Sequence, residues 1–289
     1  MFETLLFPTD GSEGATAAFD HVLDVAAAND ATVHVVNVAD TTRDSVTQIR
    51  GEVVDTLERE GRDIVEKAAD RAEKRGVATV TEVLQGEPYS TIVDYAETRA
   101  VDLVVMPTHG RRGLDRFLLG STTERVVRRS EVPVLTIRPE DDIRYPYRNV
   151  LVPTDGSDCA DDALSLAIGV VADEASLHLL SVVDVTTLGV DVRADILADT
   201  LEESATDIVD EAAERAAEAG VDDVSTDVRF GTSVSRTVRS YVEDHDIDLI
   251  VVGTHGRTGL DRYILGSVTD RIIRTSPVPV LTVRAGEES

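Results

Sequence analysis

The feature that most constrains this chain is an internal repeat. The segment TLLFPTDGS at 4–12 returns as NVLVPTDGS at 149–157. The segment THGRRGLDRFLLGSTTERVVRRS at 108–130 returns as THGRTGLDRYILGSVTDRIIRTS at 254–276, with fifteen of 23 positions identical. A repeat of this extent means that the 289 residues hold two copies of one domain.

The two copies are colinear, because the offset between them is 145 at the first motif and 146 at the second. Few insertions therefore separate the halves. We predict one domain over residues 1–138, a linker over 139–148 with the sequence PEDDIRYPYR, and a second domain over 149–289.

Each half alternates apolar runs of strand length with segments of helical periodicity. In the first half we expect strands at 4–8, 32–38, 79–84, 102–106 and 132–138, and helices at 14–28, 44–75, 89–99 and 121–130. Gly76 is placed to end the long helix. Apolar strands separated by helices predict an α/β fold, with a doubly wound, mostly parallel five-stranded sheet in each half and helices on both of its faces.

The composition is strongly acidic, with a formal net charge of −27, and Lys67 and Lys74 are the only lysines. Salt of about 1 M shortens the Debye length to about 3 Å and so weakens the self-repulsion of such a surface. We therefore expect a halophilic source. The same charge argues against nucleic acid as a partner, because a phosphate backbone requires a basic surface.

Compartment and redox state are indicated by what the sequence lacks. Cys159 is the only cysteine, so a disulfide within the chain is impossible. The N-terminal MFETLLFPTDGS has no basic region, and no segment reaches 18 apolar residues. We expect a cytoplasmic protein without a signal peptide, a membrane span or a membrane partner.

The repeated motifs fall where a ligand would bind. Ligands of open α/β sheets lie beyond the carboxyl ends of the strands, at the point where the strand order reverses. Asp10 and Asp155 follow the first strand of each half, and the two THGR segments follow the fourth strand. The sequence therefore predicts that both motifs contribute to one site in each half.

The helix after each THGR segment begins with a glycine-serine pair. We expect Ser267 to be an N-cap with Asp270 at the third helical position, and Ser121 with Glu124 to form a capping box. The free N–H groups and the dipole of such a helix start favour an anion. Gly-Ser alone is usually only a cap, and Asp-Gly-Ser is as often only a turn. Their occurrence at one sheet edge favours binding.

These motifs resemble the universal stress protein family, whose nucleotide-binding members carry G-x2-G-x9-G-[S/T]. Gly253, Gly256, Gly266 and Ser267 satisfy that pattern, and the resemblance covers both halves. It implies an adenine nucleotide alpha-hydrolase-like fold that binds ATP or AMP, with Mg²⁺ as an optional companion of the nucleotide. It also implies an internal pseudo-dimer through the last strands, VPVLTIR and VPVLTVR, and leaves room for a further homo-oligomer.

The resemblance assigns a role to each matching residue. The aspartate meets the nucleoside, the backbone of a valine in the second strand contacts adenine, and the glycines and serine hold the phosphates. The implied nucleotide-binding residues are Thr154, Asp155, Val182, Gly253, His255, Gly256, Arg257, Gly266, Ser267, Val268 and Thr269 in the second half, and Asp10, Val38, Gly110, Gly120, Ser121 and Thr122 in the first.

The first half departs from the pattern at Pro107, which replaces the first glycine. Proline has no N–H and adds a ring where the backbone should approach a ligand closely. The sequence therefore predicts that the second half binds nucleotide more tightly, and that Pro107→Gly strengthens the first site.

Other chemistry finds less support in the sequence. His109 and His255 lack a paired nucleophile, and a nucleotidylyltransferase would need a second histidine where Arg111 and Arg257 stand. These arginines would contact phosphate or pair with surface carboxylates, and the sequence favours neither. No P-loop or zinc spacing occurs. Any hydrolysis should be weak without a general base. The rival interpretation is an assembly protein with a degenerate pocket.

Overall fold

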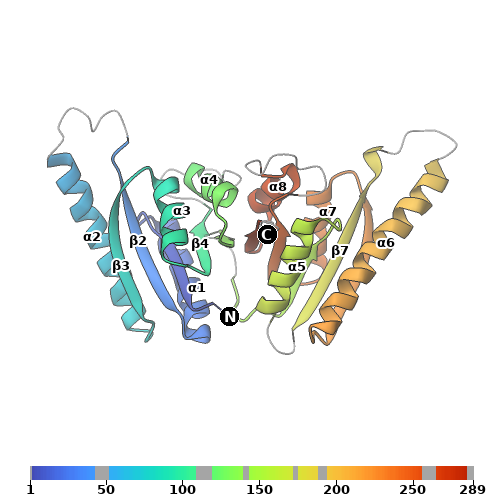
Figure 1. Ribbon diagram of the computed structural model, residues 1–289, viewed down its shortest axis with the longest axis horizontal. Coiled ribbons are helices and arrows are strands. Elements are labelled where there is room, and N and C mark those ends of the chain that lie inside the picture. The colour runs from blue at the N-terminus through green and yellow to red at the C-terminus, as the bar shows by residue number, and fades with distance from the viewer. Residues whose placement is uncertain are drawn as a thin grey trace. The chain divides into compact units, whose positions relative to one another are not determined.

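The structure is a computed structural model and describes residues 2–42, 52–108, 119–138, 143–171, 175–187, 194–255 and 265–284. The chain divides into two compact units, Met1–Asp141 and Asp142–Ser289. Each unit contains the same succession of strands and helices (Figure 1).

The predicted elements are present, with ends that differ by a few residues. The first unit contains β1 (Thr4–Pro8), α1 (Glu13–Asn29), β2 (Thr32–Asp40), α2 (Glu52–Glu73), β3 (Thr79–Gly86), α3 (Pro88–Thr98), β4 (Leu103–Pro107), α4 (Ser121–Arg129) and β5 (Val134–Ile137). The second contains β6 (Asn149–Pro153), α5 (Asp158–Val170), β7 (Ser176–Asp184), the short 3-10 helix η2 (Val185–Thr187), α6 (Ala194–Glu218), β8 (Asp223–Gly231), α7 (Val234–Asp244), β9 (Leu249–Gly253), α8 (Ser267–Thr275) and β10 (Val280–Val283).

The strands of each unit form a five-stranded sheet with the same order. That order is β3-β2-β1-β4-β5 in the first unit and β8-β7-β6-β9-β10 in the second. Within each unit the neighbouring strands pair in parallel. The predicted α/β fold with doubly wound parallel sheets is therefore confirmed.

The core of each unit is mostly aliphatic, as a chain without tryptophan requires. In the first unit, Leu5 and Leu6 of β1 are fully buried. Phe7 of β1 stacks on Phe19 of α1 with ring centroids 5.0 Å apart, which is the separation that offset aromatic pairs favour. This contact fixes α1 against the central strand, so the loop between them is held at both ends.

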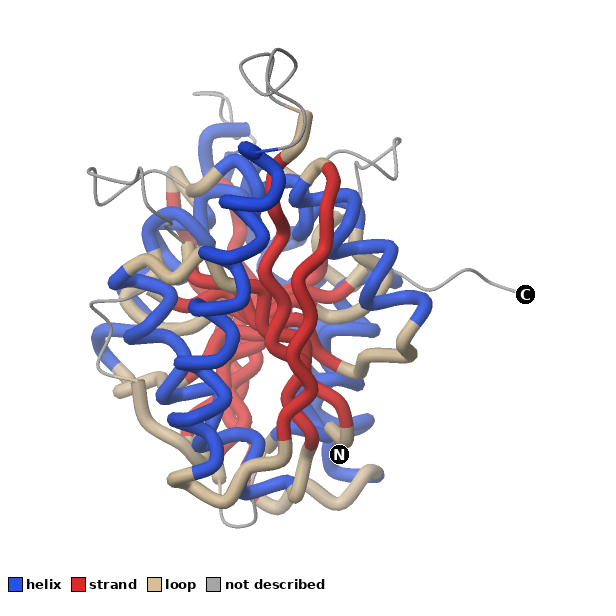
Figure 2. The backbone as a smooth tube through the Cα atoms, turned by 90° about the vertical axis from the view of Figure 1, so that its left-hand side faces the viewer, coloured by secondary structure: helices blue, strands red, loops and turns tan. Residues whose placement is uncertain are grey.

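The long helix α2 covers the outer strands of the first unit. Figure 2 shows this unit from the side of α2, with the helix running beside β2 and β3. Gly76 has a left-handed φ of 70° after α2, and the amide of Val77 then donates to the carbonyl of Ala72 at 3.0 Å. The predicted role of Gly76 in ending this helix is confirmed.

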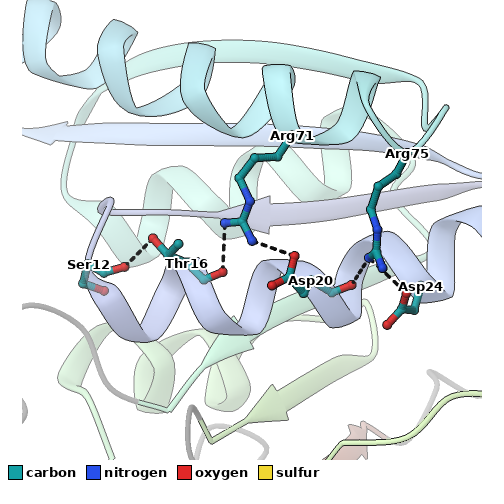
Figure 3. Close-up of polar contacts among 6 residues, drawn as sticks. All are labelled: Ser12, Thr16, Asp20, Asp24, Arg71 and Arg75. Atoms are coloured by element: carbon teal, nitrogen blue, oxygen red, sulfur yellow. Dashed lines mark hydrogen bonds and ion pairs between the residues drawn. The ribbon is translucent and has the colours of Figure 1, made fainter.

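Two arginines, one in the last turn of α2 and one just after it, form hydrogen bonds to α1 (Figure 3). Arg71 donates to the carbonyl of Thr16 at 3.0 Å and to the carboxylate of Asp20 at 2.6 Å. Arg75 donates to the carbonyl of Asp20 at 3.0 Å and pairs with Asp24 at 3.0 Å. Because each guanidinium binds both a main-chain carbonyl and a carboxylate of α1, it fixes the position of α1 along the helix axis as well as the distance between the two helices.

Within the described ranges, no helix combines the length and the apolar character that crossing a membrane requires.

Candidate functional site

The candidate site of each unit lies where two neighbouring strands end. In the first unit, β1 and β4 are paired neighbours, yet β1 leads through α1 to β2 on one side, while β4 leads through α4 to β5 on the other. The strand order therefore reverses between β1 and β4. The corresponding pair in the second unit is β6 and β9. Connections that leave in opposite directions open a crevice for a ligand at this edge.

The loop after β1 is closed by its own side chains. The amide of Gly11 donates to the hydroxyl of Thr9 at 3.2 Å, and the amide of Ser12 donates to Oδ1 of Asp10 at 3.0 Å. Gly11 has a left-handed φ of 71°, which glycine adopts without strain. The second unit repeats this arrangement over residues 154–157, with both corresponding bonds at 3.1 Å.

The same loop is tied to the second strand. The amide of Thr9 donates to the carbonyl of Val36 at 2.8 Å, and that of Thr154 donates to the carbonyl of Leu180 at 2.9 Å. Val38 and Val182 lie two residues further along β2 and β7 and are half-buried. These valines thus lie on the strand next to the aspartate loop.

A second loop begins at the end of β4 or β9 and closes on itself before the following helix. The amide of Gly266 donates to the carbonyl of Thr254 at 2.8 Å, and the hydroxyl of Thr269 donates to the carbonyl of Gly253 at 2.8 Å. These two bonds hold the start of α8 against the end of β9. The first turn of the helix is therefore positioned by the end of the sheet strand.

The predicted N-caps were wrong. The N-caps are Gly120 and Gly266, and neither helix start has a side-chain capping bond. Each glycine has its N–H occupied by a threonine carbonyl, which fixes it just outside the helix. Ser121 and Ser267 consequently become the first helical residues, so no capping box forms.

The acidic residues expected in the capping box have other partners. Glu124 and Asp270 follow the N-cap glycines by four residues, and their amides donate to those glycines' carbonyls at 2.9 Å. Their carboxylates pair with Arg128 and Arg274 one turn later, at 2.8 Å and 2.9 Å. The acids thus stabilise the helix along its length and leave its N-terminus without a carboxylate cap.

Three amide groups at the start of α8 are consequently available to a ligand. The first intrahelical bond is made by Asp270, so the N–H groups of Ser267, Val268 and Thr269 have no acceptor in the described part of the chain. The amides of Ser121, Thr122 and Thr123 are in the same position in α4. Converging N–H groups at a helix start form a site for an anion such as phosphate.

His255 is the second residue after β9, and its Cα lies 3.8 Å from the place that a Cβ on Gly266 would occupy. Its Nδ1 lies 2.9 Å from the hydroxyl of Thr254. Its Nε2 is buried and has no hydrogen-bond partner among the described residues. One nitrogen is thus fixed by the protein and the other is left for a ligand. The predicted residues Gly110, Gly256 and Arg257, as well as His109 and Arg111, lie outside the described residues.

His34 and His178 have structural roles. They are half-buried in β2 and β7, and their Nδ1 atoms lie 3.0 Å and 3.1 Å from the hydroxyls of Tyr95 and Tyr241. Burial, helped by the Arg99 guanidinium, lowers the pKa of His34. In the described ranges no group of three or more potential ligands is arranged to hold a metal ion.

Sequence reasoning missed two residues that build the site. The hydroxyl of Thr123 donates to the carbonyl of Pro107 at 2.9 Å, which is the bond that Thr269 makes in the second unit. Strict use of the repeat would have found Thr123. The amide of Asn37 donates to the carbonyl of Thr9 at 2.8 Å. The second unit has Ser181 at this position, so the repeat gave no signal for Asn37.

Comparison with known proteins agrees with this architecture. The family model described as "Universal stress protein family" matches residues 1–138 and again residues 146–284. The chain belongs to the universal stress protein family. Since both halves match, it is a tandem member with two such domains.

The chain is similar to universal stress proteins from several organisms, over its whole length or over one half. A crystal structure of one from Archaeoglobus fulgidus superimposes with a TM-score of 0.74 at 25% identity and covers 98% of each chain. One from Mycobacterium tuberculosis is 32% identical over 246 residues, 78% of each chain. One from Methanocaldococcus jannaschii is 36% identical over 141 residues, 48% of this chain and 83% of that one.

Proposed function

We propose that the chain is an adenine-nucleotide-binding protein with a regulatory role in stress, which takes ATP or AMP at the carboxyl edge of its sheets. The carrying observation is the row of three amides at Ser267, Val268 and Thr269, which face no acceptor in the described residues. The end of β9 holds these amides in place, and the loop that carries Asp155 follows the neighbouring strand, β6. Phosphate would bind the amides, and the nucleoside would bind the aspartate loop.

Because the chain is strongly acidic, nucleotide binding requires hydrogen-bond donors close to the phosphates. With a net charge of −27, the protein repels a nucleotide at long range. Affinity must then come from short-range donors, namely the helix amides, the free nitrogen of His255 and the loop arginine Arg257. Mg²⁺ bound to ATP would lower the ligand's own negative charge. Molar salt in a halophilic cytoplasm, which is part of this proposal, would further screen the repulsion.

The second unit is proposed to be the tighter site. Its phosphate loop follows Gly253 and so matches the full glycine pattern, whereas the loop of the first unit follows Pro107. Hydrolysis is expected to be slow at most, because the sequence pattern supplies no dedicated general base. The internal pseudo-dimer, and any homo-oligomer built from it, also remain part of the proposal.

Calorimetric titration of the full chain with ATP, AMP and GTP in about 1 M KCl tests the proposal. We expect ATP and AMP to bind and GTP to bind at least tenfold more weakly. Mass spectrometry of nucleotide that co-purifies with the protein would identify the natural ligand. Absence of adenine-nucleotide binding under these conditions would leave the assembly-protein interpretation in its place.

A charge substitution at the helix start separates binding from stability. Val268 is the second residue of α8 and its side chain is exposed. Val268→Asp should stabilise the helix by up to about 1 kcal/mol, because an acid complements the N-terminal dipole. The same carboxylate should weaken ATP binding at least tenfold by occupying and repelling the phosphate position. Thr122→Asp is the matched variant in the first unit. Equal affinity in Val268→Asp and the unmodified chain would contradict the proposed phosphate site.

A further inference from the structure

We propose that residue 159 in the second unit, and its counterpart residue 14 in the first, position the phosphate loop by packing against residues 253 and 107. In each unit one member of the pair has a side chain and the other is glycine. The second unit combines Cys159 with Gly253, and the first combines Gly14 with Pro107. This inference rests on the proposed function of that loop. It makes Cys159 a positioning residue, and it gives Pro107 a packing role in place of a blocking one.

In the second unit the contact leaves no space for a side chain at position 253. A Cβ built on Gly253 would lie 2.7 Å from both the carbonyl oxygen and the Sγ of Cys159. Gly253 does not have one of the positive φ angles that favour glycine. Its lack of a side chain is therefore required by contact with the main chain of residue 159, and the Sγ of Cys159 adds a second contact at the same distance. Close approach of a ligand is not needed to explain it.

Cys159 is held firmly in this contact. It is the second residue of α5, is 4% exposed, and its thiol lies 3.4 Å from the carbonyl of Val283 in β10. The cysteine thus touches the ends of both β9 and β10. Since Gly253 leads directly into Thr254 and His255, the position of Cys159 is transmitted to the loop that holds the start of α8.

The first unit has the opposite combination at the same two places. Gly14 is the second residue of α1, and Pro107 is the last residue of β4. Helix α1 packs on β4 as α5 packs on β9. The ring of Pro107 is buried. In the repeat, Gly14 corresponds to Cys159 and Pro107 to Gly253, so the residue without a side chain changes from the strand end to the helix.

The loop geometry is the same in both units despite this exchange. The amide of Gly120 lies 2.8 Å from the carbonyl of Thr108, the distance found between Gly266 and Thr254. The backbone angles φ and ψ are −58° and 138° at Gly120, and −57° and 140° at Gly266. Pro107 has therefore not collapsed the first site, and its start of α4 presents the same three amides.

The proline also costs no sheet hydrogen bond. The amide of Val104 donates to the carbonyl of Pro133, just before β5, and that of Thr108 to the carbonyl of Ile137 in β5. Because N–H directions alternate along a strand, the N–H at position 107 would point toward β1. The paired residues of β1 and β4 end at Leu6 and Val104, so no strand partner is lost at Pro107.

This packing reverses the result expected for Pro107→Gly. Removal of the ring opposite Gly14 leaves a void under the loop, so the single substitution should weaken the first site. The combination of Pro107→Gly with Gly14→Cys should recover it by recreating the contact of the second unit. The first unit should then bind nucleotide in the unmodified chain, which gives two sites per chain.

The test compares melting temperature without nucleotide, and ATP affinity by calorimetry, for full-length variants. Gly253→Ala should lower the melting temperature by about 5 °C and weaken ATP binding about tenfold at the second site. Cys159→Gly in the same chain should recover part of both losses. The background substitutions Thr122→Asp and Val268→Asp silence the first and second sites respectively, so that each site is titrated alone.

The possible results distinguish the packing pair, the positioning role of Cys159 and the proposed nucleotide binding from one another. Additive effects of Gly253→Ala and Cys159→Gly on melting would overturn the packing pair, as would a stronger first site in Pro107→Gly alone. Recovery of melting temperature without recovery of affinity would overturn the positioning role of Cys159. If Gly253→Ala does not fold, soluble protein from the double variant counts as recovery. Failure of the unmodified chain to bind ATP would refute the proposed function, whereas the melting comparison would still decide the packing pair.

Discussion

Asn37 donates its side-chain amide to the carbonyl oxygen of Thr9 at 2.8 Å, from a position 8% exposed. The bond joins strand β2 to the loop that carries Asp10. On its other side, the Oδ1 of Asn37 faces Gly61 of α2, where a Cβ would lie only 2.6 Å away. The helix, the strand and the ligand loop are therefore packed through one amide group.

The second unit has Ser181 and Ala205 at these two positions, which gives a direct prediction. Gly61→Ala alone should destabilise the protein because its methyl group would lie 2.6 Å from Oδ1 of Asn37 and 2.9 Å from Cγ1 of Val83. Combined with Asn37→Ser it should cost less, because only the Val83 contact remains and the preference of alanine for a helix over glycine, about 1 kcal/mol, offsets it. Urea unfolding of the three variants checks this. A stabilising effect of Gly61→Ala with Asn37 present would contradict the contact.

The hydroxyl of Thr269 is predicted to contribute through the buried carbonyl of Gly253. Thr269→Val keeps the side-chain shape but leaves that carbonyl without its donor, so we expect a loss of about 1–3 kcal/mol in the free energy of unfolding. Thr123→Val is the matched change in the first unit. Chemical denaturation measures both. Thr275→Val, which removes the bond from the half-buried Thr275 hydroxyl to the Arg271 carbonyl of the same helix, serves as control. Equal effects of Thr269→Val and Thr275→Val would contradict the prediction.

The contact between α2 and α1 (Figure 3) should depend on the planar guanidinium of Arg71 and not on its charge alone. Arg71→Lys retains the charge but cannot reach both the Thr16 carbonyl and the Asp20 carboxylate, so it should cost about 1 kcal/mol of unfolding free energy. The loss should persist in high salt, because the bond to the carbonyl is local. Denaturant melts of Arg71→Lys in low and high KCl decide this, and full recovery of stability in high salt would show a purely ionic role.

Buried His21 should make the fold sensitive to acid. Burial lowers the pKa of His21 from 6.5 to about 4 in the folded protein. The folded state therefore keeps the ring neutral where the unfolded chain protonates it. Its contribution is fully present above pH ~6.5 and is lost as the pH falls toward about 4, by about 1.4 kcal/mol per pH unit.

His21→Leu tests this, because the second unit has Leu166 at the equivalent position. The variant should lose less stability than the unmodified chain between pH 6.5 and 4, by roughly 3 kcal/mol at most. Carboxylates titrate in the same range, so the quantity to compare is the difference between the two proteins in unfolding free energy. Parallel stability curves would show that His21 is not the group responsible.

The sequence predicted the fold well because the relevant signals are local. Apolar runs and helical periodicity located β1 at its observed bounds, Thr4–Pro8, and Gly76 was correctly expected to end α2. The helix starts at Ser121 and Ser267 were predicted too, yet their caps were assigned to the serines. The local pattern could not show that a threonine carbonyl would hold the preceding glycine in the cap position.

The site was predicted in outline but not in its contacts. The repeat and the strand ends pointed to Asp10, Asp155 and the glycine-rich loops. Asn37, Gly61 and Cys159 gave no comparable signal, because their roles arise from residues distant in the chain. Gly253 was assigned to close ligand approach, whereas its neighbour in the structure is Cys159.

By itself, the sequence determined that this protein has two repeated α/β domains and that the loops shared by both repeats follow strands that end at one sheet edge. Periodic burial and strand order suffice for that, since both are set by neighbours along the chain. Only the tertiary structure decided which amides remain free, which glycine caps each helix and which side chain fills each space. Those outcomes depend on atoms that close packing brings together from different elements, and a one-dimensional pattern does not specify such contacts.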